Sequence, residues 1–206
     1  MEVSNGKIKT LSSEEIIGEK ATFKNNSAFT EQRQGKSFVI YSDNGQEKTI
    51  DQDDAPSEAN NFMGLSFSSP KFSPNGDFIS YGATGWEWFM TRVYDIQKNK
   101  MILQLSDDNN NGFTPDEKYF YACAISQFSG EQHGWVYSSP DFKVQYDLFG
   151  DSANANYMNL DCGYDSSKKV VRFTLSDHYE NGQENPDQKR VIEYSLTDKK
   201  SRLIQQ

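Results

Sequence analysis

Short runs of aromatic and β-branched residues, separated by polar turns, recur through most of this chain. The clearest example begins at Ser73-Pro-Asn-Gly76, where a proline that fixes φ precedes an Asn-Gly pair that tolerates positive φ. Two strands are expected after this turn, at Asp77–Tyr81 and Arg92–Ile96, because both runs are rich in residues that favour a half-buried strand. The polar stretch Gln97–Lys100 then predicts a hairpin into a third strand at Met101–Leu103.

The same unit is repeated along the chain. The segment Phe113-Thr-Pro-Asp-Glu-Lys-Tyr-Phe-Tyr-Ala122 copies its opening about forty residues after Phe72, and a weaker copy opens at Tyr164. The closing hairpin also recurs, beginning near Val39, Val93, Trp135 and Val191. We therefore expect four repeats, covering approximately residues 7–50, 63–105, 107–149 and 156–206.

A period of about forty to fifty residues that contains several short antiparallel strands is typical of β-propeller blades. The sequence thus predicts an all-β fold, a four-repeat propeller-like array of small antiparallel sheets that forms a single domain over residues 1–206. Two other arrangements stay open, a two-sheet β-sandwich and an open propeller fragment.

The motif Phe72-Ser-Pro-Asn-Gly-Asp77, followed by Val93-Tyr-Asp-Ile96, resembles the WD40-like repeats called PD40 that build TolB-type propellers. The resemblance is clear over about residues 65–148, and the fourth copy has Asp165-Ser-Ser-Lys168 in place of the turn. It implies a propeller fold, and it points to exported proteins. A periplasmic or extracellular location is therefore expected if a signal peptide or lipid anchor was removed from this chain.

The chain is acidic, with a formal net charge of −9 and a pI near 4.8. This charge repels phosphate backbones, so we expect no nucleic-acid partner. No apolar stretch approaches the length that crosses a bilayer, so we expect a soluble chain without membrane insertion. The oligomeric state stays open.

The chain has two cysteines, Cys123 and Cys162. Neighbouring repeats could bring them together, but sequence alone does not establish a pair. Our expectation is two free, buried cysteines that act as small hydrophobic residues.

Several connections can also be predicted. Lys7–Leu11 is expected to be a strand that could complete the last sheet and close a ring, and Ser12–Ile17 resembles a helix-capping box. In the first repeat, two middle strands are expected on either side of a polar loop at 25–36. Asp51–Asn61 and His178–Gln188 are expected to be surface loops.

Three repeats keep their longest loop between the same two strands, which is where a propeller would place a binding face. In the second repeat this loop carries Trp86, Glu87 and Trp88, whose rings and carboxylate suit a sugar or a peptide. The equivalent loop of the third repeat, Gln127–Trp135, would add His133 and Trp135 to the same site. The alternative is that these rings plug the blades.

The segment that starts at Asp107 resembles a calcium-binding loop, because oxygen-bearing side chains alternate ahead of a glycine. Its twelfth position is Lys118, so Asp116 or Glu117 would have to supply the last carboxylate. A plain Asn-rich turn is the alternative. The candidate Ca²⁺ ligands are Asp107, Asn109, Asn111 and Glu117, and no other cofactor is expected.

Motifs for nucleophilic hydrolysis, zinc catalysis and phosphate binding are absent from the sequence. Glu87 and Glu131 are the candidates for a glycosidase-like carboxylate pair. We expect that the protein is not an enzyme. The leading hypothesis is a non-catalytic binding or scaffold domain that recognises a protein or peptide through its long-loop face. The alternative is a lectin-like domain that binds a carbohydrate or another small ligand through its loop tryptophans.

Overall fold

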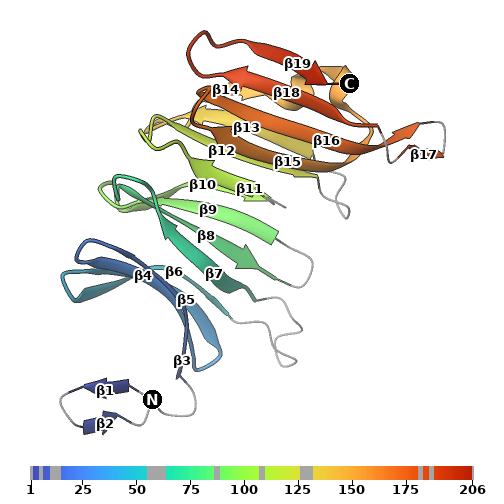
Figure 1. The fold of residues 1–206 in the computed structure, drawn as a ribbon. Coiled ribbons are helices and arrows are strands. Elements are labelled where there is room, and N and C mark those ends of the chain that lie inside the picture. The colour runs from blue at the N-terminus through green and yellow to red at the C-terminus, as the bar shows by residue number, and fades with distance from the viewer. Residues whose placement is uncertain are drawn as a thin grey trace. The chain divides into compact units, whose positions relative to one another are not determined.

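The computed structural model describes residues 2–4, 7–9, 15–54, 64–85, 89–106, 110–125, 132–180, 183–185 and 188–205. Apart from two short 3-10 turns, the regular elements of these residues are strands, and they form antiparallel sheets (Figure 1). Four of the sheets follow one another along the chain, and we call them blades 1 to 4. The chain divides into two compact units, Met1–Phe72 with Gly76–Gln104 and Ser73–Asn75 with Leu105–Gln206.

Blade 1 is a meander of long strands joined by two-residue turns. At Asn44-Gly45 both residues have positive φ, 48° and 86°, as the turn of a tight hairpin requires. The polar loop predicted at 25–36 is wrong, because a strand that buries Ala28 and Phe29 occupies it. The strands are β3 (Glu15–Phe23), β4 (Asn26–Arg33), β5 (Lys36–Asp43) and β6 (Gln46–Asp54).

The N-terminal predictions are also corrected. Glu15–Ile17, the end of the expected capping box, lies in β3 and not in a helix. The strand expected near Lys7 exists as β2 (Lys7–Lys9), but it pairs with β1 (Glu2–Ser4) in a separate hairpin. Within the described residues, β2 thus pairs with β1 and with no strand of blade 4, so the expected closure through this strand is not found there.

Blade 2 confirms the strands and turns expected from the clearest repeat. The Ser73–Gly76 turn joins its first two strands, and Gly76 adopts a φ of 81°. A side chain at Gly76 would collide with the Phe23 ring of blade 1. Glycine is therefore required here both for the positive φ of the turn and for the contact between the turn and blade 1. The strands are β7 (Ser66–Phe72), β8 (Phe78–Thr84), β9 (Phe89–Asp95) and β10 (Lys100–Ser106).

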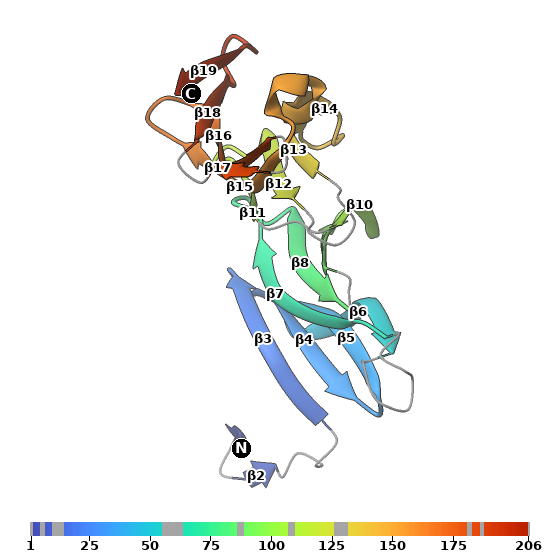
Figure 2. The same ribbon diagram turned by 90° about the vertical axis from the view of Figure 1, so that its right-hand side faces the viewer.

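In the first unit, β7 packs against β3, β4 and β5, as Figure 2 shows. The surface connection predicted at Asp51–Asn61 is wrong at its start, because Asp51 belongs to β6 and is largely buried. Its carboxylate accepts hydrogen bonds from the Tyr81 hydroxyl and the Arg92 guanidinium of blade 2, each at 2.8 Å. The hydrophobic core of this unit consists of Ala28, Val39, Leu65, Phe67, Ile79, Tyr81, Ala83 and Tyr94.

Blade 3 opens the second unit and is followed by two 3-10 turns, η1 (Leu148–Gly150) and η2 (Ser152–Asn154). Asp147 and Asp151 cap these turns by accepting a backbone N–H bond, and Leu148 is fully buried. The strands of blade 3 are β11 (Asn110–Phe113), β12 (Tyr119–Ile125), β13 (Gln132–Ser138) and β14 (Val144–Asp147).

Blade 4 carries a strand addition that the sequence did not suggest. The loop predicted at His178–Gln188 is wrong in part, because His178–Glu180 pairs with Gln183–Asn185 in a hairpin extension. The strands of blade 4 are β15 (Tyr157–Asp165), β16 (Val170–Glu180), β17 (Gln183–Asn185), β18 (Arg190–Ser195) and β19 (Ser201–Gln205).

A disulfide joins the two blades of the second unit. Cys123 of β12 and Cys162 of β15 form the bond, with their Cα atoms 6.1 Å apart. The expectation of two free cysteines is therefore wrong, because the packing of β12 on β15 brings together residues 39 positions apart. The disulfide lies in the core of this unit, with Val136, Leu148, Tyr157, Leu160, Val171, Phe173, Leu175, Ile192 and Tyr194.

Candidate functional site

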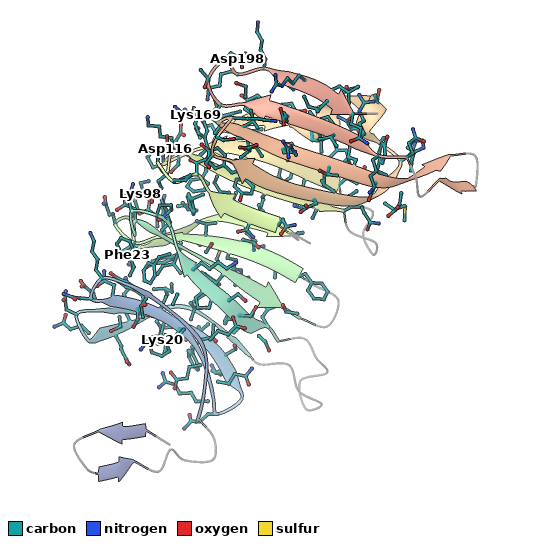
Figure 3. All side chains as sticks on the ribbon, viewed as in Figure 1. Lys20, Phe23, Lys98, Asp116, Lys169 and Asp198 are labelled. Atoms are coloured by element: carbon teal, nitrogen blue, oxygen red, sulfur yellow. A yellow bond between two sulfur atoms is a disulfide. The ribbon has the colours of Figure 1, made fainter. Side chains whose placement is uncertain are left out.

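Each blade has two ends. The first and third turns of a meander lie at one end of its sheet, and the connection between its second and third strands lies at the other. We call these the turn end and the loop end. In the second unit, Asp116, Lys169 and Asp198 mark the turn end (Figure 3).

Side-chain hydrogen bonds fix the turn end. The Asp95 carboxylate accepts the backbone N–H of Lys98 at 2.7 Å, and the Asp165 carboxylate accepts that of Lys168 at 3.2 Å. Burial raises the pKa of Asp95, but the hydrogen bonds from Lys98 outweigh it and hold this pKa below its usual range. The turn end is thus built of short, locally fixed turns.

The connections at the loop end vary most in length, from the two-residue turn of blade 1 to the β17 extension of blade 4. Thr84 pairs with Phe89 and Ile125 pairs with Gln132, so the connections of blades 2 and 3 start from these pairs, while β17 extends the connection of blade 4. Phe89 and Met158 near this end are 48% and 42% exposed, and Met101 and Val144, which follow turns of the other end, are 40% and 53% exposed, so exposed apolar side chains occur at both ends. The predicted ligand residues Trp86, Glu87 and Trp88 lie outside the described residues, as does Glu131.

His133 and Trp135 lie in β13, so the loop predicted to reach Trp135 ends earlier, at the start of this strand. Their rings are stacked, with centroids 4.6 Å apart and an interplanar angle of 8°. His133 is only 3% exposed, and Trp135 also contacts the Tyr137 ring edge to face. The structure therefore brings these two residues together in an aromatic row, and their part in ligand binding stays a prediction.

Two of the four predicted calcium ligands, Asp107 and Asn109, lie outside the described residues. Asn111 is in β11 opposite Ala122, and Glu117 is a buried residue of the following turn. The Glu117 carboxylate accepts the backbone N–H of Asn75 at 2.7 Å, which is a structural contact within the second unit. The calcium site stays a prediction.

Sequence reasoning missed an ion cluster on blade 4. Because side chains alternate along strands, Val171 and Phe173 enter the core while Arg172 and Thr174 face the opposite side, which we call the outer face. Glu193 of β18 lies opposite Arg172 on this face and is fully buried.

Three cations surround the Glu193 carboxylate. Arg172 donates from Nη2 to Oε1 at 2.7 Å, and Arg202 donates from Nη2 to Oε2 at 2.8 Å. Lys168 contributes Nζ at 3.4 Å from Oε1. The hydrogen bonds from Arg172, then those from Arg202 and Lys168, outweigh burial and lower the pKa of Glu193 to about 2. We call these four residues the Glu193 cluster.

A shallow depression adjoins the cluster on the outer face. It has a volume of about 220 Å³. Gly163 lies at its centre, directly opposite Arg172, and a Cβ atom placed on Gly163 would meet no atom within 4 Å. The residues that line it are Asp161, Gly163, Tyr164, Asp165, Arg172 and Thr174.

The described residues contain no group of three or more His, Cys, Asp or Glu side chains that could hold a metal ion. The same part of the chain has no helix long and apolar enough to cross a membrane.

The chain matches no protein-family model, and no curated protein matches it. Its similarity lies with solved structures. One match is the β-propeller domain of the Trilobed protease from Pyrococcus furiosus, which is described as having an open velcro topology. Its sequence is 10% identical and its TM-score is 0.53. This match covers 93% of this chain and 58% of the other. An acylaminoacyl peptidase from Pyrococcus horikoshii is 12% identical with a TM-score of 0.54, over 95% of this chain and 33% of that one.

TolB from Acinetobacter baumannii also matches, at 16% identity and a TM-score of 0.42, over 86% of this chain and 37% of that one. This chain therefore spans only part of each of these structures. The match to the Trilobed protease domain, together with the four successive antiparallel sheets, confirms the expected fold. The chain has the β-propeller type of fold that its PD40-like repeats predicted, in the form of four blades.

Proposed function

We propose that the protein is a non-catalytic binding domain that recognises a protein or peptide through its loop end. The observation that carries this proposal is the contrast between the two ends of the blades. Local hydrogen bonds hold turns at one end of the blades, whereas the connections at the other end differ from blade to blade and include the β17 hairpin of blade 4. Connections that vary on a rigid scaffold commonly carry binding residues.

The ionisable groups of the described residues support binding over catalysis. Their lowered carboxyl pKa values belong to turn residues and to Glu193, and each is explained by a structural hydrogen bond. A catalytic pair would need two titratable groups that converge on one cleft with opposed shifts. The candidates Glu87 and Glu131 can be tested directly by substitution.

The disulfide supports an exported location. Disulfides form and persist in oxidising compartments and are rare in reducing ones. The Cys123–Cys162 bond therefore favours the periplasmic or extracellular placement that the PD40 resemblance suggested.

A peptide array of random sequences tests the proposed function. We expect the wild-type chain to bind a defined subset of peptides, and we expect Trp86→Ala/Trp88→Ala to weaken this binding at least about tenfold, as for central aromatic contacts. The matched control is Lys98→Ala/Asp198→Ala at the turn end, which should bind like the wild type.

Two results would contradict the proposal. One is an array on which no peptide binds above background, and the other is binding that the loop variant leaves unchanged. Titration with oligosaccharides, followed by tryptophan fluorescence, tests the lectin-like alternative. A saturable shift with sugars and none with peptides would replace the proposal by that alternative.

A further inference from the structure

We infer that Arg190 and Asn154 form a binding site for an amide group of the partner peptide, either a side-chain carboxamide or a main-chain peptide group. The site lies at the loop end of the second unit. It deepens the proposed function, on which it rests, because it names the chemical group that this part of the loop end recognises.

Both residues belong to the loop end. Arg190 is the first residue of β18, and Asn154 lies in η2, within the link from the end of β14 to the start of β15. The second and fourth strands of a meander end on the same side, so the connection into β18 and this link lie at the same end. The Arg190 Nη2 atom is 3.8 Å from Asp151 Oδ2, and the Asp151 carbonyl accepts the backbone N–H of Asn154 at 3.0 Å. Asp151 therefore connects the two residues.

Each of the two side chains holds a buried polar atom that has no hydrogen-bond partner in the described part of the chain. The atoms are Arg190 Nε and Asn154 Oδ1. The Arg190 side chain is only 14% exposed, and Asn154 is 1% exposed. The Asn154 amide nitrogen already donates to the Leu148 carbonyl at 2.6 Å, so exchanging its oxygen and nitrogen would not supply a partner. Because buried polar groups are nearly always paired, a donor and an acceptor left over in one place indicate a ligand that pairs with both.

A third atom of this kind lies at the same end. His178 Nδ1 is buried and has no hydrogen-bond partner among the described residues. Its ring packs against Tyr157, the first residue of β15, with centroids 4.8 Å apart. At the turn end, by contrast, the carboxylates of Asp95 and Asp165 accept backbone hydrogen bonds. Polar atoms that can still form a hydrogen bond thus occur at the end proposed for binding.

The chemistry of the two atoms selects the ligand. A guanidinium can only donate and an amide oxygen can only accept, so the ligand must offer an acceptor to Arg190 and a donor to Asn154. An amide group carries both. A carboxylate carries only acceptors, and it would meet the carboxylates of Asp147 and Asp151, which cap η1 and η2. A neutral amide is therefore favoured over an anion. It reaches Arg190 beside Asp151, whose side chain is 62% exposed.

The test uses the full chain and the peptide acetyl-Gly-Gln-Gly-N-methylamide, followed through the Nε–H signal of Arg190 in an NMR titration. We expect this signal to shift saturably, with a dissociation constant in the millimolar range, because few hydrogen bonds are formed. The same peptide with Gly in place of Gln separates the two sources of the amide. Weaker binding assigns the side-chain carboxamide, and equal binding assigns the main-chain peptide group. The peptide with Glu in this position should bind no more tightly than the Gln peptide.

Two variants test the assignment. Arg190→Met keeps a long side chain without donors and should weaken binding of the Gln peptide at least about tenfold. It should not lower the urea midpoint of unfolding, because it removes a buried donor without a partner, whereas an arginine with a purely structural role would lower it. Asn154→Leu removes the acceptor and should weaken binding about three- to tenfold. Arg33→Met, at an exposed arginine of blade 1, is the matched control and should bind like the wild type.

Three results would overturn the inference. The first is an Arg190 signal that responds to none of the peptides, and the second is tighter binding of the Glu peptide, which would assign an anion site. The third is binding that Arg190→Met leaves unchanged. If Asn154→Leu fails to fold, Arg190→Met and its control decide alone. The loop variant Trp86→Ala/Trp88→Ala should bind the Gln peptide normally, so failure of the proposed function at the tryptophan loop would be seen separately.

Discussion

Arg172 and Glu193 lie directly opposite each other on β16 and β18, and the arginine donates both Nε and Nη2 to the same carboxylate oxygen, at 3.2 and 2.7 Å. Arg202 repeats this arrangement on the other oxygen. Glu193 therefore accepts hydrogen bonds from two guanidinium groups that come from the strands on either side of β18, while it is itself completely buried.

Replacing Glu193 should destabilise blade 4. Glu193→Gln removes the charge and leaves three cations close together, and we expect a loss of about 2 kcal/mol in the free energy of unfolding, because the cations are partly exposed. Urea unfolding monitored by circular dichroism measures this. Asp141→Asn, at an exposed ion pair with Lys143, is the control and should change stability by less than about 0.5 kcal/mol. Equal effects of the two substitutions would show that the Glu193 cluster has no special role.

The Glu193 cluster also predicts a pH dependence. The pKa of Glu193 falls from an ordinary 4.5 to about 2 in the folded protein, so its stabilising effect is complete above pH 4.5 and is lost as the pH falls toward 2. Unfolding measured between pH 6 and pH 2 should therefore show the difference between wild type and Glu193→Gln shrinking toward zero at acidic pH. A difference that stays constant down to pH 2 would contradict this assignment.

The disulfide should stabilise the second unit. Cys123→Ala/Cys162→Ala opens a covalent loop of 39 residues, for which the loop-entropy relation gives a loss of about 4 kcal/mol. Thermal unfolding of this variant beside the wild type measures the effect, with reduced wild type as the matched comparison. Labelling of the unfolded, unreduced wild type with a thiol reagent should detect no free thiol. One or two reactive thiols per chain would contradict the pairing.

Two glycines of the first unit form a matched pair for substitution. Both Gly45 and Gly76 have positive φ, 86° and 81°, but only Gly76 lies against another group, with the Phe23 ring 2.3 Å from the added Cβ position. We expect Gly45→Ala to cost about 1 kcal/mol from backbone strain alone, and Gly76→Ala to cost about 3 kcal/mol. Equilibrium unfolding checks the order. Equal costs would mean that the Phe23 ring moves away without penalty.

The sequence predicted blade 2 well. Its Ser73–Gly76 turn combines a proline with an Asn-Gly pair, which favour a turn, and its strands are rich in aromatic and β-branched residues. Blade 1 was harder. The strand β4 has only a short apolar stretch at Ala28-Phe29 among polar residues, and its turn at Gln34-Gly35 carries no strong signal. The strand is therefore recognisable only through its pairing with both neighbours.

The outer face of blade 4 could not be predicted, because it is assembled from separate strands. Glu193 is 21 residues from Arg172 and nine from Arg202, and no spacing rule connects them. The one local signal was the presence of charged residues inside otherwise apolar strands. The disulfide likewise depends on which blades pack together, and that information lies in the tertiary structure.

The chain folds as successive antiparallel blades of about forty residues, and neighbouring blades pack face to face within each unit. Nuclear Overhauser contacts in the full chain test this fold most directly. We expect cross-strand contacts within blades, such as Phe120 to Tyr137 and Phe173 to Ile192, together with contacts from Cys123 to Cys162 between blades 3 and 4. Strand pairs that join residues of different blades, or helical contacts within β12 or β16, would contradict it.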